Sequence, residues 1–189
     1  MKLNNKYYIL RHGEALSNVK DIVSCWPEKI NNPLTKTGRK TIEDISAELR
    51  NKKIGLIFSS DLLRTKQTSE IVSKVLKIKP KFDKRLREIN FGIFSGGPSK
   101  NFVKFFKDRS ERIKKGAPHG ESYDDVFKRM TLFFKEINNK YNGKNILIIS
   151  HQAPLFLLEG YTKGFSLIKA IKEFPEERML RKGQLRELS

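Results

Sequence analysis

The stretch "YYILRHGEALSN", residues 7–18, combines an apolar run suited to a buried strand with an abrupt polar stop at Arg11-His12. A second stretch, "NILIISHQAP" at 145–154, has the same form, because four aliphatic residues lead into a serine and then His151. The chain contains only three histidines, and two of them directly follow strand-like runs. This repetition predicts that both histidines belong to one site at the end of a buried sheet.

The rest of the chain alternates strand-like and helix-like segments. Strands are expected at 6–10, 54–60, 79–86, 145–150 and, as an edge strand, 183–188. Helices are expected from about 36 onward and over 62–76, 100–115, 122–140, 154–164 and 166–173. Such alternation predicts a single α/β domain over 1–189, a three-layer α/β/α sandwich with a mostly parallel sheet and helices on both faces. Sites in such sheets lie outside the carboxyl ends of the strands.

Three of the expected helices begin with residues that commonly cap a helix. Thr35 or Thr37 precedes the first helix, and Asp61 precedes the helix over 62–76. Ser122 is followed three residues later by Asp125, which resembles a capping box.

The composition is that of a globular protein without a membrane-spanning segment. Hydrophobic residues make up 38% and charged residues 32% of the 189 residues. No apolar run approaches the roughly 20 residues that cross a bilayer, and the first apolar run meets Arg11 too soon to be the core of a signal peptide. A single cysteine, Cys25, excludes an internal disulfide and fits a reducing compartment. We therefore expect a cytoplasmic protein with no membrane partner.

The formal net charge of +18 predicts affinity for anions, which include phosphate esters, nucleic acids and acidic membranes. Lysine and arginine are spread along the whole chain instead of forming a basic arm. This distribution favours a basic solvated surface over a nucleic-acid-binding segment. Nucleic acid is therefore not expected as a partner, and the sequence leaves the oligomeric state open.

Six sequence blocks together resemble the histidine phosphatase superfamily, also called phosphoglycerate mutase-like. They occur in that family's order and are "LRHGEALSN" at 10–18, "PLTKTGRK" at 33–40, "SSDLLRTKQTSEIV" at 59–72, "LREINFG" at 86–92, "HGESYDDVFKRM" at 119–130 and "ILIISHQAP" at 146–154. The resemblance implies a phosphomonoesterase that works through a phosphohistidine intermediate. A small phosphorylated substrate and inorganic phosphate as product are expected, with no metal and no organic cofactor.

The resemblance implies two catalytic residues. His12 would be the nucleophile, and a neutral imidazole is well suited to attack phosphorus. Glu88 would protonate the leaving oxygen, a role that typically accelerates a reaction by about 10²–10⁴-fold. The residues alone leave another interpretation of Glu88 open, which is an ion pair with Arg85 or Arg87.

Five further residues are expected to bind phosphate. Arg11, Arg64, His151 and Asn18 match family positions, and Ser24 is a candidate donor from a nearby loop. Guanidinium groups suit this role because they match phosphate oxygens bidentately. Taken singly, each histidine could be a satisfied core residue and Arg64 an ordinary surface arginine.

The segment 93–120 is expected to form the substrate mouth. It is short compared with that of the family's mutases, so water should reach phosphohistidine, which favours a phosphatase over a phosphoglycerate mutase. Gln152 stands where the family often has glycine and would narrow the pocket. The helix at 100–115 is either a specificity element with lysines at the mouth or a basic surface helix. The second "HGE", 119–121, is expected to be structural, with His119 facing water.

Two more functions are compatible with these residues. One is that of a protein-phosphohistidine phosphatase. The second belongs to a different functional class, a basic module of the same fold that binds nucleic acid or further anions without catalysis.

Overall fold

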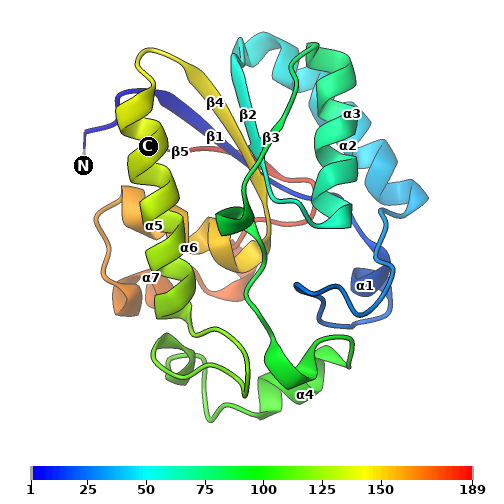
Figure 1. Cartoon of the computed structure of the whole chain (residues 1–189), viewed down its shortest axis with the longest axis vertical. Coiled ribbons are helices and arrows are strands. Elements are labelled where there is room, and N and C mark those ends of the chain that lie inside the picture. The colour runs from blue at the N-terminus through cyan, green and yellow to red at the C-terminus, as the bar shows by residue number, and fades with distance from the viewer. Residues whose placement is uncertain (1, 189) are drawn as a thin grey trace.

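A five-stranded sheet forms the centre of the molecule in the computed structural model, which describes residues 2–188 (Figure 1). The strands are β1 (Lys6–Arg11), β2 (Leu56–Ser59), β3 (Lys81–Phe82), β4 (Asn145–Ser150) and β5 (Leu185–Leu188), in the order β3-β2-β4-β1-β5. β1, β2, β3 and β4 are parallel, whereas β5 pairs antiparallel with β1 at the edge. The mostly parallel sheet and the terminal edge strand confirm the sequence prediction, although the strand expected at 79–86 shortens to two residues.

Helices cover both faces of this sheet, as predicted (Figure 1). They are α1 (Leu16–Val19), α2 (Lys36–Leu49), α3 (Leu63–Leu76), α4 (Ser99–Lys104), α5 (Tyr123–Lys140), α6 (Gln152–Thr162) and α7 (Leu167–Glu173). Short 3₁₀ turns occupy Arg50–Lys52, Lys84–Leu86, Gly92–Phe94, Glu111–Ile113 and Glu176–Arg178. α2 and α3 lie on one face and α5 and α6 on the other, while α4 lies apart from the sheet at one end of the molecule (Figure 1).

The core divides into two layers because successive strand residues point to opposite faces. Ile9 and Ile148 pack with the large apolar residues of α5 and α6. Their neighbours Leu10 and Ile149 pack with those of α2 and α3. β1, β2 and β4 are therefore buried on both sides, which explains why the sequence shows continuous apolar runs there instead of alternation.

Two of the predicted helix caps are present and one is not. Thr35 accepts a hydrogen bond from Gly38 N at the start of α2, and Ser122 forms a capping box with Asp125 at the start of α5. The prediction that Asp61 caps the following helix is wrong, because α3 begins at Leu63 with Leu62 in the N-cap position. The Asp61 carboxylate instead forms a bidentate pair with Arg87, with both distances 2.6 Å.

The helix predicted at 100–115 is also wrong in its extent. α4 ends at Lys104, and the chain turns before the short 3₁₀ segment begins at Glu111. Asp108 Oδ1 accepts hydrogen bonds from Ser110 N at 2.7 Å and Glu111 N at 3.2 Å, which offers the backbone an alternative to continued helix. The phenylalanines of this segment collect into their own apolar cluster around Phe102.

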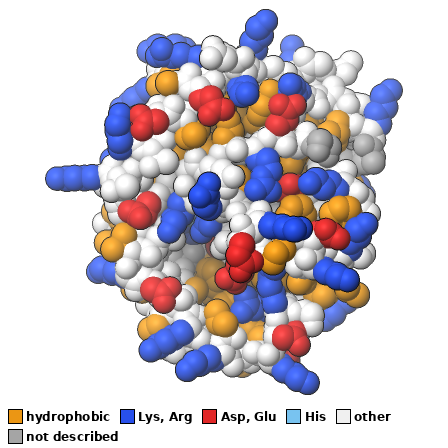
Figure 2. Space-filling view, turned by 180° about the vertical axis from the view of Figure 1, so that it is seen from behind, with side chains coloured by type: hydrophobic (Ala, Val, Ile, Leu, Met, Phe, Trp, Pro, Cys, Tyr) orange, Lys and Arg blue, Asp and Glu red, His pale blue; other side chains and the backbone are white. Residues whose placement is uncertain are grey.

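The surface carries its basic side chains in a scattered arrangement. Figure 2 shows lysine and arginine spread over one face, with acidic and apolar side chains between them. Within residues 2–188, no helix combines the length and apolar character that crossing a bilayer requires.

Candidate active site

The residues that end β1 and β4 meet at one edge of the sheet, as predicted. Arg11 pairs with Ser150 in the last register position of the two strands, so His12 and His151 follow side by side. Their rings lie 5.2 Å apart between centroids. Arg64 reaches the same place from the first turn of α3.

A cleft of about 280 Å³ opens at this edge. Its lining includes six of the seven residues predicted for the site, which are Arg11, His12, Asn18, Ser24, Arg64 and Glu88. The seventh, His151, is fully buried and lies behind His12. Segments far apart in the sequence therefore converge on one small volume.

His12 is held as a neutral imidazole with a defined tautomer. Its side chain is buried, and Nδ1 lies 2.7 Å from the Gly13 carbonyl oxygen. Because a carbonyl can only accept, Nδ1 carries the proton and Nε2 keeps its lone pair. Arg64 Nε donates to that lone pair at 3.2 Å. Burial, and then the positive charges of Arg64 and Arg11, lower the His12 pKa well below its ordinary value.

Two glycines fix the backbone around His12. A Cβ on Gly13 would lie 2.6 Å from the carbonyl oxygen of Gly38, and a Cβ on Gly38 would collide with the backbone of Glu14. The loop after β1 therefore crosses the first turn of α2 at a distance that only glycines allow. The crossing explains both the "HGE" at 12–14 and the glycine of "KTGRK" at 36–40.

The two arginines of the cleft are only partly satisfied by the protein. Arg64 is 3% exposed, donates to the Ser24 carbonyl oxygen at 3.0 Å and pairs with Glu28 at 3.4 Å. Arg11 donates from Nη1 to the Leu180 carbonyl oxygen at 2.9 Å. Its Nε has no partner within residues 2–188.

Unpartnered polar atoms concentrate at this cleft. Within residues 2–188, four buried side-chain nitrogen or oxygen atoms lack a hydrogen-bond partner, namely Arg11 Nε, Ser24 Oγ, His151 Nδ1 and Arg112 Nε. Three of them belong to the predicted site. Buried polar groups are nearly always hydrogen-bonded, so these three atoms are available to solvent or to a ligand in the cleft.

Glu88 is a half-buried carboxyl group at the wall of the cleft. Its Oε1 accepts a hydrogen bond from Ile89 N at 3.0 Å. Burial raises the pKa of Glu88, although the positive charges of Arg64 and Arg11 oppose the shift. The shift favours the protonated carboxyl, which is the form that a general acid requires.

The neighbours of Glu88 in the sequence have partners of their own. Arg85 pairs with Asp83 at 2.6 Å, and Arg87 pairs with Asp61 at 2.6 Å. Neither arginine pairs with the Glu88 carboxylate, so the ion-pair interpretation of Glu88 is wrong.

Asn18 lines the cleft, but its Oδ1 already accepts a hydrogen bond from Ala15 N at 2.9 Å. Only its amide nitrogen is therefore free to reach a ligand, since no hydrogen bond from Nδ2 occurs within the described chain.

The second "HGE" is structural, as predicted. His119 is exposed and does not line the cleft. Glu121 pairs with Arg129 at 2.9 Å and accepts a hydrogen bond from Asn90 N. Arg129 also donates to the carbonyl oxygens of Arg85, Arg87 and Glu88, so it braces the loop that presents the acid. Sequence reasoning missed this role.

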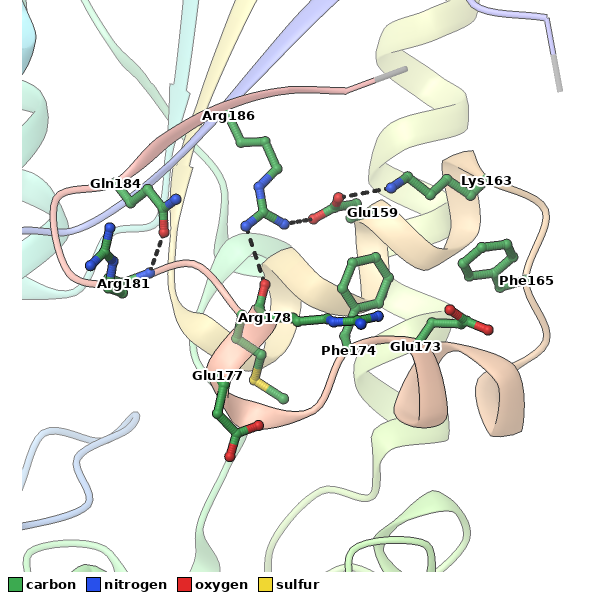
Figure 3. A pocket seen from close by; sticks show the side chains of 11 residues that line it. Glu159, Lys163, Phe165, Glu173, Phe174, Glu177, Arg178, Arg181, Gln184 and Arg186 are labelled. Carbon is green, nitrogen blue, oxygen red and sulfur yellow. Dashed lines mark hydrogen bonds and ion pairs between the residues drawn. The ribbon is translucent and has the colours of Figure 1, made fainter.

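A larger cavity, of about 600 Å³, lies elsewhere, between α6, α7 and the segment leading into β5 (Figure 3). Glu159 is buried there and accepts from Arg186 at 2.6 Å and Lys163 at 3.2 Å. One buried carboxylate thus pairs with two cations.

The family relationship is shown by a family model described as histidine phosphatase superfamily (branch 1), which matches residues 7–172. The chain belongs to the histidine phosphatase superfamily. Two bacterial relatives carry the name "Probable phosphoglycerate mutase GpmB". The Photorhabdus laumondii protein is 28% identical over 83% of this chain and 74% of its own. The Yersinia pestis protein is 29% identical over 78% of this chain and 70% of its own.

Solved structures of similar fold include phosphatases. Bacillus stearothermophilus YhfR superposes with a TM-score of 0.82 at 26% identity, covering 97% of this chain and 90% of its own. A mycobacterial glucosyl-3-phosphoglycerate phosphatase in complex with VO3 gives a TM-score of 0.80 at 21% identity, with 97% and 90% coverage. The second likeness shows the fold alone.

Two residues of this histidine phosphatase site had no separate signal in the sequence. Ser60 lies 2.9 Å from His151 Nε2, within the quoted "SSD" block but not singled out. Lys182, from the loop before β5, lines the cleft, and its charge contributes to the lowered His12 pKa. Among 39 basic residues, nothing in the sequence marks this lysine.

Proposed function

We propose that the protein is a metal-independent phosphomonoesterase that hydrolyses small phosphorylated metabolites through a phosphohistidine on His12. One observation carries the proposal. The neutral Nε2 of His12 shares a small cleft with two guanidinium groups and with buried polar atoms that have no partner in the described chain. A phosphoryl group supplies the acceptors that these donors lack.

In the first step, His12 Nε2 attacks phosphorus and the bond to the leaving oxygen breaks. Arg64 Nε, which now donates to Nε2 at 3.2 Å, turns to a phosphoryl oxygen and frees the lone pair. Arg11 and Arg64 stabilise the charge on the equatorial oxygens, which is the main requirement of phosphoryl transfer. Glu88 gives its proton to the leaving oxygen, so that an alcohol departs.

His151, whose ring lies next to that of His12, contributes a hydrogen-bond donor to the phosphoryl group. Ser60 Oγ accepts from Leu62 N at 3.4 Å and lies 2.9 Å from His151 Nε2, and we infer that the hydroxyl is the donor of this second hydrogen bond. The ring proton of His151 then sits on Nδ1, the atom without a partner in the described chain. Burial lowers the pKa of His151 far below its ordinary value, so it donates as a neutral imidazole.

In the second step, a water molecule attacks the phosphorus of phosphohistidine. Glu88, now a carboxylate, takes a proton from that water, and the bond between phosphorus and Nε2 breaks. Inorganic phosphate leaves, and both His12 and Glu88 return to their starting protonation states. All atoms and charges balance without a metal or organic cofactor.

The decisive experiment compares His12→Ala with His119→Ala, a matched removal of an exposed histidine outside the cleft. Phosphate release from p-nitrophenyl phosphate is expected to be lost in the first variant, unchanged in the second, and insensitive to a chelator. Rapid denaturation in alkali should trap a base-stable, acid-labile phosphoryl label on the wild-type chain. Activity retained in His12→Ala would refute the mechanism.

The names of the relatives favour a second candidate, a phosphoglycerate mutase. Conversion of 3-phosphoglycerate to 2-phosphoglycerate with a bisphosphate primer, in preference to release of free phosphate, would establish it. The short segment 93–120 favours hydrolysis. Release of phosphate from a phosphohistidine-bearing protein would instead support a protein-phosphohistidine phosphatase. Salt-sensitive nucleic-acid binding that survives His12→Ala would support a non-catalytic binding module.

A further inference from the structure

Arg112 is a nearly buried arginine without a counter-ion. Its side chain lies over the rings of Phe102 and Phe106, with the guanidinium carbon 4.9 and 5.1 Å from their centroids. The residue is 9% exposed, and its Nε has no hydrogen-bond partner in the described chain. None of the ion pairs within residues 2–188 includes it. A buried charge is normally paired, because its desolvation is otherwise uncompensated.

The nearby Arg109 shows what a structural arginine in this region looks like. It also lies on aromatic rings, 4.7 Å from the Phe156 centroid, but its Nη1 donates to the Phe174 carbonyl oxygen at 2.7 Å. Arg109 thereby ties the segment after α4 to the end of α7. The Arg112 side chain forms no such hydrogen bond within the described chain. Packing against the aromatic rings therefore does not explain why a charged residue stands at this position.

Arg112 lines a second cavity that adjoins the phosphate cleft. This cavity has a volume of about 310 Å³. It shares six lining residues with the phosphate cleft, which are Asp21, Val23, Glu88, Phe91, Ser99 and Gln152. Since Glu88 belongs to both, the second cavity begins where the leaving group of a phosphate ester would lie.

The remaining wall of the second cavity is mostly apolar, with Phe102, Val103, Tyr123, Phe156 and Met179. Besides Glu88, two acidic residues line this cavity: Asp21, whose Oδ1 accepts a hydrogen bond from Ser99 Oγ at 2.5 Å, and Glu176. Neither pairs with the Arg112 guanidinium. A guanidinium in an apolar cavity suits a planar or tetrahedral anion, which it can bind bidentately.

We propose that Arg112 binds a second anionic group of the substrate, an inference that rests on the proposed phosphomonoesterase function. The substrate is then a phosphate monoester whose leaving group carries a carboxylate or a second phosphate on a short apolar or aromatic linker. The reacting phosphate occupies the cleft at His12, the linker crosses beside Gln152, and the second anion reaches Arg112. Gln152 and the aromatic wall set the size of the linker.

The test compares ω-carboxyalkyl phosphates of increasing chain length with alkyl phosphates of the same length, and a parallel series carries a phosphonate in place of the carboxylate. In the wild type, kcat/KM for the best anionic substrate should exceed that of its uncharged counterpart by about tenfold or more. In Arg112→Met, which keeps the apolar stem, this ratio should fall to about one. Arg112→Lys should keep part of it. The two series identify which anion is preferred.

Lys107→Met is the matched control, because it removes the same charge from an exposed residue that lines neither cavity. It should keep the wild-type ratio. A ratio near one at every length in the wild type, or a ratio retained in Arg112→Met, would overturn the proposal.

Binding of ω-carboxyalkyl phosphonates, measured by calorimetry, separates this proposal from the catalytic one. Weaker binding to Arg112→Met in a chain that hydrolyses no phosphate ester would uphold the second anion site and refute only the proposed catalysis. Equal binding to both chains would overturn the site whatever the catalytic result.

Discussion

Acidification is expected to destabilise the protein through the two histidines of the site. Burial and the nearby arginines lower the pKa of both His12 and His151 well below the ordinary value of 6.5. As the pH falls through about 6.5, the unfolded chain gains two protons that the native chain does not. Protons bound only by the unfolded state favour unfolding. The free energy of unfolding that the two histidines contribute is therefore fully present above about pH 6.5 and declines as the pH falls below it.

The size of the loss follows from the proton count. Between about pH 7.5 and 5.5, a histidine whose pKa in the unfolded chain is 6.5 contributes a loss of about 1.4 kcal/mol, so two contribute about 2.7 kcal/mol. Glu88 acts in the opposite direction, because its raised pKa gives stability that is lost as the pH rises. Carboxylates with a lowered pKa, such as Asp61 with an ordinary value of 3.8, exchange their protons below this range.

The assay is urea unfolding at the two pH values in phosphate-free buffer, in a Glu88→Gln background that removes the opposing carboxyl. We expect the free energy of unfolding to fall by about 2.7 kcal/mol on acidification. Adding His151→Asn should reduce this fall to about 1.4 kcal/mol. A free energy that is constant, or that rises on acidification, would show that the histidines are not held neutral and would refute the reasoning.

Three further predictions concern single positions. Glu88→Gln should lower kcat for alkyl phosphates by about 10²–10⁴-fold and affect p-nitrophenyl phosphate much less, and equal losses for both esters would count against the acid role. In the wild type, kcat/KM should decline as the pH rises through the raised Glu88 pKa. Gly38→Ala should destabilise the fold by about 1–3 kcal/mol in thermal unfolding, because its Cβ meets the Glu14 backbone; an unchanged midpoint would contradict the tight crossing. Ser24→Ala should weaken competitive inhibition by inorganic phosphate about three- to tenfold, since Ser24 Oγ lacks a partner in the described chain and is free to donate to phosphate. An unchanged inhibition constant would place that hydroxyl outside the phosphate site.

The parts of the fold that could be predicted are those set by local patterns. The apolar runs at β1, β2 and β4 are continuous because both sheet faces are buried, and this signal does not depend on distant residues. The prediction of a helix over 100–115 was wrong because two effects that the helical pattern does not show decide where the helix ends. Its aromatic residues join the cluster around Phe102, and Asp108 bonds to the backbone ahead of it.

The residues of the candidate site likewise fall into those that a sequence pattern marks and those that only the folded structure reveals. Arg11, His12 and His151 could be found because strand ends in a parallel sheet share one edge. Arg112 and Lys182 could not, because each is one basic residue among 39 and nothing nearby in the sequence distinguishes it. What distinguishes Arg112 is the absence of a partner within the described chain, which is a property of the folded arrangement.

The placement of the unpartnered atoms argues that the site is built for a ligand. All four buried side-chain atoms without a partner in residues 2–188 belong to residues that line two adjoining cavities or, for His151, lie behind one of them. Leaving such an atom without any partner would cost about 1–3 kcal/mol, so each is expected to hydrogen-bond to solvent or to a ligand. An accidental packing defect would leave such atoms anywhere in the core, whereas the rest of the described core has none. A single substrate with two anionic groups would supply the acceptors for both cavities at once.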